Sequence, residues 1–106
     1  RAVVPSALAA IALLSPNGAE ALAADEVTAV RWLSEGLAGD VLVEYSLDHG
    51  FSWSPVDPPN VGDTGQYAWL IPPVDSTEAQ IRVSSVLRPS VADVSDQVFT
   101  IRTGTP

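Results

Sequence analysis

Residues 46–53, with the sequence Ser-Leu-Asp-His-Gly-Phe-Ser-Trp, constrain the fold of this chain more than any other segment. They follow a strand-like run at residues 41–45. An Asp in a tight turn accepts hydrogen bonds from backbone N–H groups just downstream, and a Gly two residues later can adopt a positive φ. A large aromatic residue can then pack back over the turn. The offsets of Asp48, Gly50 and Trp53 therefore predict a self-supporting β-hairpin.

The same segment resembles a known hairpin motif. Ser46, Asp48, Gly50, Ser52 and Trp53 form the pattern Ser-x-Asp-x-Gly-x-Ser-Trp. This pattern is similar to the Asp-box hairpin of sialidase-type repeats and of many extracellular β domains. The resemblance implies a secreted β protein and a structural role for the five residues rather than a catalytic one.

Composition limits the chain to one modest domain and excludes several partners. The 106 residues are 46% hydrophobic and 17% charged, which is unlike a disordered tail. Five Arg, no Lys and 13 acidic residues give a net charge of −8. Nucleic acid and anionic membranes both require a basic patch, so we expect neither nucleic-acid binding nor membrane insertion. The acidic residues lack the spacing of a calcium-binding loop, which favours a solvated acidic surface over a cation site.

The absence of Cys excludes disulfides, thiolate metal sites and Cys nucleophiles. We expect no cofactor.

Short strands separated by turn residues predict an all-β fold. Apolar residues alternate with polar ones in several runs, and Gly or Pro ends each run. The segment containing Pro55, Pro58, Pro59 and Gly62 is predicted to be irregular, and residues 7–14 are ambiguous between helix and strand. The predicted core comprises Val30, Trp32, Val43, Tyr45, Tyr67, Trp69, Ile81, Val83, Phe99 and Ile101.

The order of these segments resembles a family of Ig-like domains. The segments are residues 15–20, 30–32, the hairpin, 65–69, 81–84 and 94–101. Together they look like the Ig-like repeats of bacterial secreted and cell-surface proteins, which are similar to the N-terminal domain of yeast cell-wall glucan-synthesis proteins. The resemblance implies a Greek-key β-sandwich of about seven strands over residues 11–102, with no enzymatic activity of its own. Ala19 and His49 depart from the family pattern, since Gly is common at both turn positions.

The segment before this domain, residues 1–10, is apolar and has no charge after Arg1. A signal peptide with a cleavage site at residues 21–23 is less favoured, because cleavage there would remove residues 15–20, which match the start of the Ig-like pattern. Three alternatives remain for the segment: an extended first strand of its own domain, an interdomain linker, or an arm that packs on a neighbouring copy. The last alternative is slightly favoured because the apolar run continues beyond the needs of one strand, and it predicts an open filament. The candidate interface residues are Val3, Val4, Leu8 and Ile11, and residues 103–106 form a C-terminal tail.

Residues that could carry chemistry have simpler structural explanations. His49 lies in the hairpin turn, and the chain has no second His or Cys to complete a catalytic or metal site. Asp57 with Asp63, and Asp93 with Asp96, are pairs of acids in loops, where Asp usually accepts hydrogen bonds from turn amides. The aromatic residues that could stack on a sugar also fit the core, Trp53 least clearly: Trp32, Trp53, Trp69, Tyr45 and Tyr67.

The sequence therefore predicts a secreted or cell-surface structural module without catalytic residues, either a repeat domain or a self-assembling fibre subunit. The alternative is a carbohydrate-binding or adhesion domain of a larger secreted protein. A domain from a large hydrolase is a third and weaker alternative.

Overall fold

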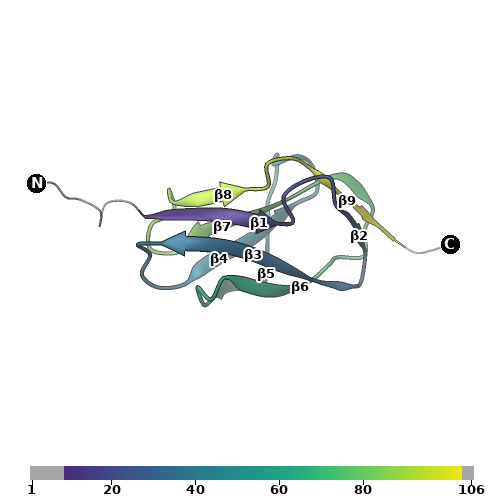
Figure 1. The fold of residues 1–106 in the computed structure, drawn as a ribbon. Helices are drawn as coiled ribbons and strands as arrows, with labels where there is room; N and C mark the ends of the chain where they lie inside the picture. Colours follow the sequence, from purple (N-terminus) through teal and green to yellow (C-terminus); the bar gives the residue numbers. More distant parts are fainter. Residues whose placement is uncertain (1–8, 104–106) are drawn as a thin grey trace, which may run out of the picture.

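The computed structural model describes residues 9–103, without the side chains of residues 57–59, and this part of the chain contains only strands, turns and loops (Figure 1). The prediction of an all-β fold is therefore confirmed. The nine strands are β1 (Ala10–Ser15), β2 (Ala21–Ala23), β3 (Val27–Glu35), β4 (Val41–Ser46), β5 (Ser54–Val61), β6 (Gln66–Leu70), β7 (Ser76–Ser85), β8 (Ala92–Val94) and β9 (Phe99–Arg102).

The strands form two sheets in a β-sandwich-like arrangement. The first sheet has three antiparallel strands in the order β1-β3-β6. The second has the order β2-β9-β7-β4-β5, and β8 pairs with β7 beside this path. Only the β2–β9 pair is parallel among the described strands. The first sheet is therefore narrower than the sheet it covers.

The core lies between the sheets because alternate residues of each strand point inward. Eight of the ten predicted core residues are buried, and Tyr45 and Tyr67 are only partly buried against the same cluster. Burial removes most of the apolar side-chain surface from water, which is the main stabilising term for a domain of this size. The buried hydrophobic residues are Ile11, Leu13, Val30, Trp32, Val41, Val43, Val56, Trp69, Ile71, Ala79, Ile81, Val83, Phe99 and Ile101.

The structure corrects two expectations about the strands. The described residues contain nine strands rather than about seven, because β2 and β8 are three-residue strands too short to show a period of two. The segment with Pro55, Pro58 and Pro59 is not irregular but forms β5. Since β5 is an edge strand that pairs only with β4, proline residues there need not interrupt a second ladder.

The ambiguous N-terminal segment becomes strand β1 from Ala10 onward. Ala10 pairs with Glu35, the last residue of β3, so β3 ends level with the start of β1. Ile11 and Leu13 point into the core while Ala10, Ala12 and Leu14 are exposed. Val3, Val4 and Leu8 lie outside the described residues, as does most of the tail at 103–106.

The start of β1 and the end of β9 lie at opposite ends of the domain (Figure 1). The described residues include no helix of the length and hydropathy needed to cross a membrane.

Candidate functional site

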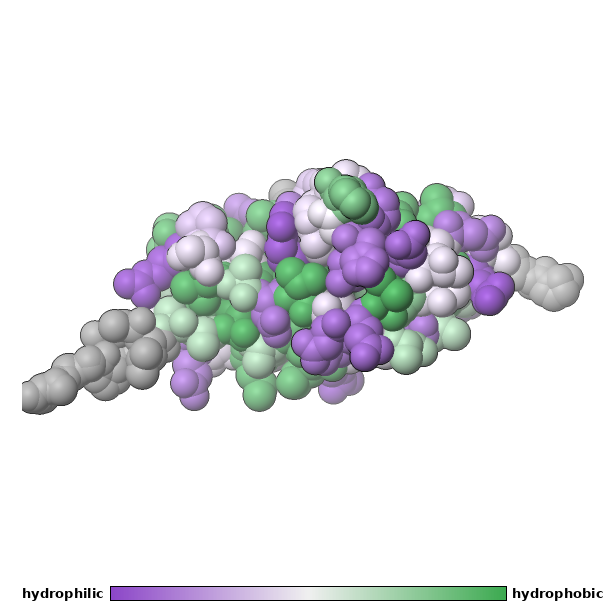
Figure 2. Space-filling view, turned by 90° about the horizontal axis from the view of Figure 1, so that it is seen from above, coloured by the Kyte–Doolittle hydropathy of each residue, from purple (hydrophilic) through white to green (hydrophobic). Residues whose placement is uncertain are grey.

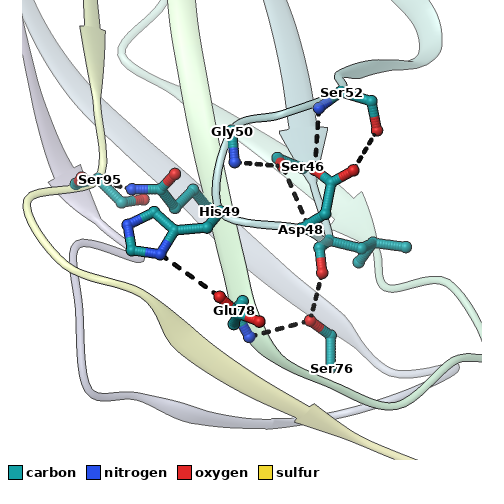
Figure 3. A network of polar contacts seen from close by, with 10 residues as sticks. Ser46, Asp48, His49, Gly50, Ser52, Ser76, Glu78 and Ser95 are labelled. Carbon is teal, nitrogen blue, oxygen red and sulfur yellow. Dashed lines mark hydrogen bonds and ion pairs between the residues drawn. The ribbon is translucent and has the colours of Figure 1, made fainter.

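The hydroxyl of Ser46 is the centre of the hairpin turn between β4 and β5 (Figure 3). Its Oγ accepts hydrogen bonds from the backbone N–H of Gly50 at 2.8 Å and of Asp48 at 3.2 Å. It donates to Asp48 Oδ1 at 2.7 Å. Ser46 is only 1% exposed, so water has little access to its hydroxyl. The hydroxyl holds the turn together from inside.

The carboxylate of Asp48 closes the turn from the other side. Asp48 Oδ1 accepts the Ser52 backbone N–H at 2.9 Å, and Oδ2 accepts the Ser52 hydroxyl at 2.6 Å. The hydrogen bonds from the Ser52 and Ser46 side chains, together with the Ser52 N–H, lower the pKa of Asp48 from 3.8 to about 2. The ionised carboxylate is thus a structural acceptor, as the motif predicts.

Gly50 and Trp53 complete the hairpin. Gly50 has φ 85°, the left-handed conformation expected from the sequence. A Cβ placed there would lie 3.6 Å from Cζ2 of Trp53, so the indole packs back over the turn. On β7, Arg82 places its Cζ 4.3 Å from the centroid of the Trp53 ring and binds Glu44 Oε1 through Nη2 at 2.8 Å. One face of the half-buried Trp53 is therefore covered by a cation and is unsuited to stacking on a sugar.

Ala19 and His49, the two positions that differ from the Ig-like pattern, both adopt left-handed backbone conformations. Their φ values are 67° and 62°, a region that L-residues other than Asn and Asp enter at a cost. The His49 N–H bonds the Glu78 carbonyl on β7 at 2.9 Å, and its imidazole lies 3.5 Å from the exposed Glu78 carboxylate (Figure 3). These contacts dock the turn on β7.

The acidic residues proposed in pairs bind separate partners, and Asp57 and Asp93 lie in strands β5 and β8 rather than in loops. Asp63 accepts the Trp32 indole N–H at 2.8 Å and the Ser34 hydroxyl at 2.6 Å. Asp93 accepts the backbone N–H of Leu13 at 2.7 Å, and Asp96 accepts an amide N–H of Asn17 at 2.9 Å. The side chain of Asp57 lies outside the described residues.

The described residues contain no group of three or more His, Cys, Asp and Glu side chains that could hold a metal ion. Within this part of the chain, every buried side-chain nitrogen and oxygen has a hydrogen-bond partner.

The aromatic residues divide between the core and a surface groove. Trp32 and Trp69 are buried, and Trp69 packs against Tyr45 with ring centroids 5.6 Å apart. Tyr45 and Tyr67 line a groove of about 280 Å³ between the neighbouring edge strands β5 and β6. The groove was not predicted, because its walls come from segments far apart in the sequence: Tyr45, Pro55, Val56, Tyr67, Trp69, Leu70 and Pro72.

The outer face of the β1-β3-β6 sheet is a second surface that the sequence pattern did not reveal. Val27 and Leu70 lie opposite each other at one end and are 63% and 62% exposed. Leu33, opposite Ala12, is 61% exposed at the other end. We call this surface the apolar face; its outward residues are Ala10, Ala12, Leu14, Val27, Ala29, Arg31, Leu33, Glu35, Gln66, Ala68 and Leu70.

Elsewhere the surface is more mixed. Viewed from above, hydrophilic and hydrophobic residues are interspersed over the domain (Figure 2). Ile11, one of the proposed interface residues, is 9% exposed and packs in the core of its own domain, so little of its side chain is available to a neighbour. This corrects its assignment to an intermolecular surface.

Comparisons with models of protein families, with curated proteins and with solved structures found no match to this chain. The resemblance to Ig-like repeats stays a prediction.

Proposed function

We propose that this chain is a non-catalytic structural module of a secreted or cell-surface assembly, with an Ig-like Greek-key architecture, and that it associates with copies of itself. The apolar face carries the proposal. Exposed apolar residues that gather on one sheet face, rather than scatter singly, mark interaction surfaces.

Electrostatics favour a second copy as the partner of this face. Two chains of net charge −8 repel each other over most of their surfaces. The outward residues of the apolar face include one cation, Arg31, and one anion, Glu35, so the face is nearly neutral. Copies can therefore meet there with less repulsion than over the acidic remainder.

The polar network of the hairpin supports a structural role. Its Ser and Asp side chains bond one another and the turn backbone, which leaves them engaged within the fold. The placement of the start of β1 and the end of β9 at opposite ends of the domain also suits modules joined in a row (Figure 1).

Sedimentation velocity of the full chain over a concentration series tests the proposal. We expect concentration-dependent association that strengthens with added salt, because salt screens the repulsion between acidic copies. Leu33→Glu puts a charge on the apolar face and should weaken association by about tenfold or more. Leu87→Glu is the matched control, since Leu87 is 66% exposed outside this face.

A chain that stays monomeric at every concentration would contradict the proposal. An equal loss of association in Leu33→Glu and Leu87→Glu would show that the apolar face is not the contact.

Carbohydrate binding is the second candidate, and the groove with Tyr45 and Tyr67 favours it. Trp53 is less suited, because Arg82 covers its ring. Retention of the chain on a polysaccharide matrix that is lost in Tyr67→Ala, with the fold intact, would support binding in the groove.

A further inference from the structure

We propose that the outer edge of β6 and the groove beside it accept an extended strand formed by residues 1–8 of a second copy. This inference rests on the proposed self-association and names its acceptor and its donor. Such strand addition combines backbone hydrogen bonds to a sheet edge with burial of alternate side chains in an adjacent groove.

The two sheets leave room for one more strand at this edge. β6 ends a sheet of three strands, whereas the opposing sheet continues through β4 to β5. The groove of about 280 Å³ lies where the narrower sheet stops, between β5 and β6. A strand added to β6 would extend the narrow sheet and cover Tyr45 and Tyr67.

The pairing of β6 with β3 shows which backbone groups face the open edge. The Trp32 N–H bonds the Gly65 carbonyl at 3.0 Å, and the Ile71 N–H bonds the Glu26 carbonyl at 2.9 Å. In an antiparallel ladder, the direction of the backbone groups alternates along the strand. Residues 67 and 69 therefore direct their N–H and C=O groups to β3, while Gln66, Ala68 and Leu70 direct theirs to the open edge. There the Gln66 carbonyl already accepts the Thr64 hydroxyl at 3.1 Å, so the acceptor groups are those of Ala68 and Leu70 and the Gln66 N–H.

The other two long edges are less suited to strand addition. β5 contains Pro55, Pro58 and Pro59, which lack the N–H that a new strand would need. On the outer side of β1, the Leu13 N–H is bound by Asp93. β6 has five residues without proline and is the better acceptor among the described edges.

The sequence of residues 1–8 fits the chemistry of this acceptor. Residues 2–8 are uncharged and mostly apolar, and the described residues that line the groove are uncharged as well. Transfer of the donor strand against these residues would therefore bury no unpaired charge among them.

The described strands restrict pairing of residues 1–8 within their own domain, both beside β1 and at the β6 edge. Ala10 already pairs with Glu35, the last residue of β3, so a strand continued upstream would find no partner on β3. A strand added outside β6 would lie three strand spacings from β1. Its near end, beside Gln66, is also displaced along the sheet by four residues of β3, from Glu35 to Arg31. That path is roughly 19 Å, or about six extended residues, which leaves about two of the eight for pairing. A second copy is free of this restriction.

Pro5 determines which residues of the donor strand can form backbone hydrogen bonds with β6. Because Pro5 has no N–H, its backbone must point away from β6. The direction of the backbone groups alternates, so Val4, Ser6 and Leu8 would pair with β6 while Val3, Pro5 and Ala7 point away.

Proline substitutions at two adjacent positions of the full chain test which N–H groups of the donor strand bond β6. Ser6→Pro removes an N–H that the strand requires, and Ala7→Pro removes one that it does not. We expect sedimentation velocity to show association at least about tenfold weaker in Ser6→Pro and unchanged in Ala7→Pro. On the acceptor, Ala68→Pro removes an N–H that β6 directs to the open edge, and it should also weaken association. Near-UV circular dichroism checks that each variant is folded. If Ala68→Pro does not fold, the comparison of Ser6→Pro with Ala7→Pro still decides the test.

The outcomes separate this inference from the proposed function. Equal association of Ser6→Pro, Ala7→Pro and the unchanged chain would overturn the donated strand while leaving self-association in place. Monomeric behaviour of the unchanged chain would overturn both. If a saccharide occupies the groove and the proline variants associate normally, the groove serves a ligand and the inference is wrong.

Discussion

Replacement of Ser46 by Ala should destabilise the domain far more than the loss of one surface hydroxyl would suggest. The Ser46 Oγ accepts two backbone N–H groups and donates to the Asp48 carboxylate; Ser46 itself is 1% exposed, and Asp48 and Gly50 are half-buried. Without the Ser46 hydroxyl, the Gly50 N–H loses the acceptor that lies 2.8 Å away. A buried polar group left unsatisfied costs about 1–3 kcal/mol, so we expect a loss of about 2–3 kcal/mol from the free energy of unfolding.

Urea unfolding followed by Trp fluorescence measures this loss. With a urea slope of about 1–3 kcal/mol/M, the midpoint of Ser46→Ala should fall by about 0.7–3 M. Ser52→Ala is the matched control: it removes the bond from the Ser52 hydroxyl to Asp48 but keeps the bond from the Ser52 N–H. Its cost should stay below about 1 kcal/mol because the site is exposed to water. Equal losses in the two variants, or a loss below about 0.5 kcal/mol in Ser46→Ala, would refute the central role of the buried hydroxyl.

Three further predictions follow from the backbone and from buried polar contacts. Ala19→Gly should raise the unfolding free energy by about 1 kcal/mol in urea titration, because Ala19 has φ 67°; an unchanged or lower value would contradict this. The pKa of Asp48 is about 2 when folded and 3.8 ordinarily, so its stabilising contribution is complete above about pH 4 and is lost as pH falls toward 2. The stability advantage over Asp48→Asn should therefore shrink over that window, and a pH-independent difference would count against the assignment. Asp63→Ala should cost about 1–3 kcal/mol by leaving the indole N–H of buried Trp32 without its acceptor, and thermal unfolding that matches the unchanged chain would disprove it.

The sequence predicted the features that depend on local chemistry. The hydrogen bonds of the Ser46 hydroxyl and the Asp48 carboxylate lie within the same short segment, so residue spacing predicts them, whereas the contacts of the turn with β7 are tertiary. The buried faces of β3 and β9 follow from alternation, which is a property of each strand by itself. In β7 the alternating Ala79, Ile81 and Val83 are buried as predicted, but the neighbouring Gln80 and Ser84 are buried too. Tyr45 and Tyr67 also occupy the inward positions that alternation predicts. They remain partly exposed because they lie where the three-stranded sheet ends.

The features that sequence reasoning missed depend on which strands become neighbours. Proline indicates a break in a central strand, but β5 is an edge strand, and its position in the sheet is a tertiary property. The groove joins residues from β4, β5 and β6, and no local pattern marks them as neighbours. The apolar face was hidden for a related reason: Leu33 and Leu70 looked like ordinary members of strand segments until their exposure was known.

Hydrogen exchange with mass spectrometry, at low and high protein concentration, tests the central claim that copies associate through the three-stranded sheet and its β6 edge. We expect association to slow exchange in peptides that cover β6 and in peptides that cover residues 1–8, since both would gain backbone hydrogen bonds together. Peptides of β5, the edge with three proline residues, should exchange at the same rate at both concentrations. Exchange that is independent of concentration throughout the chain, or protection confined to strands other than β1, β3 and β6, would contradict the account.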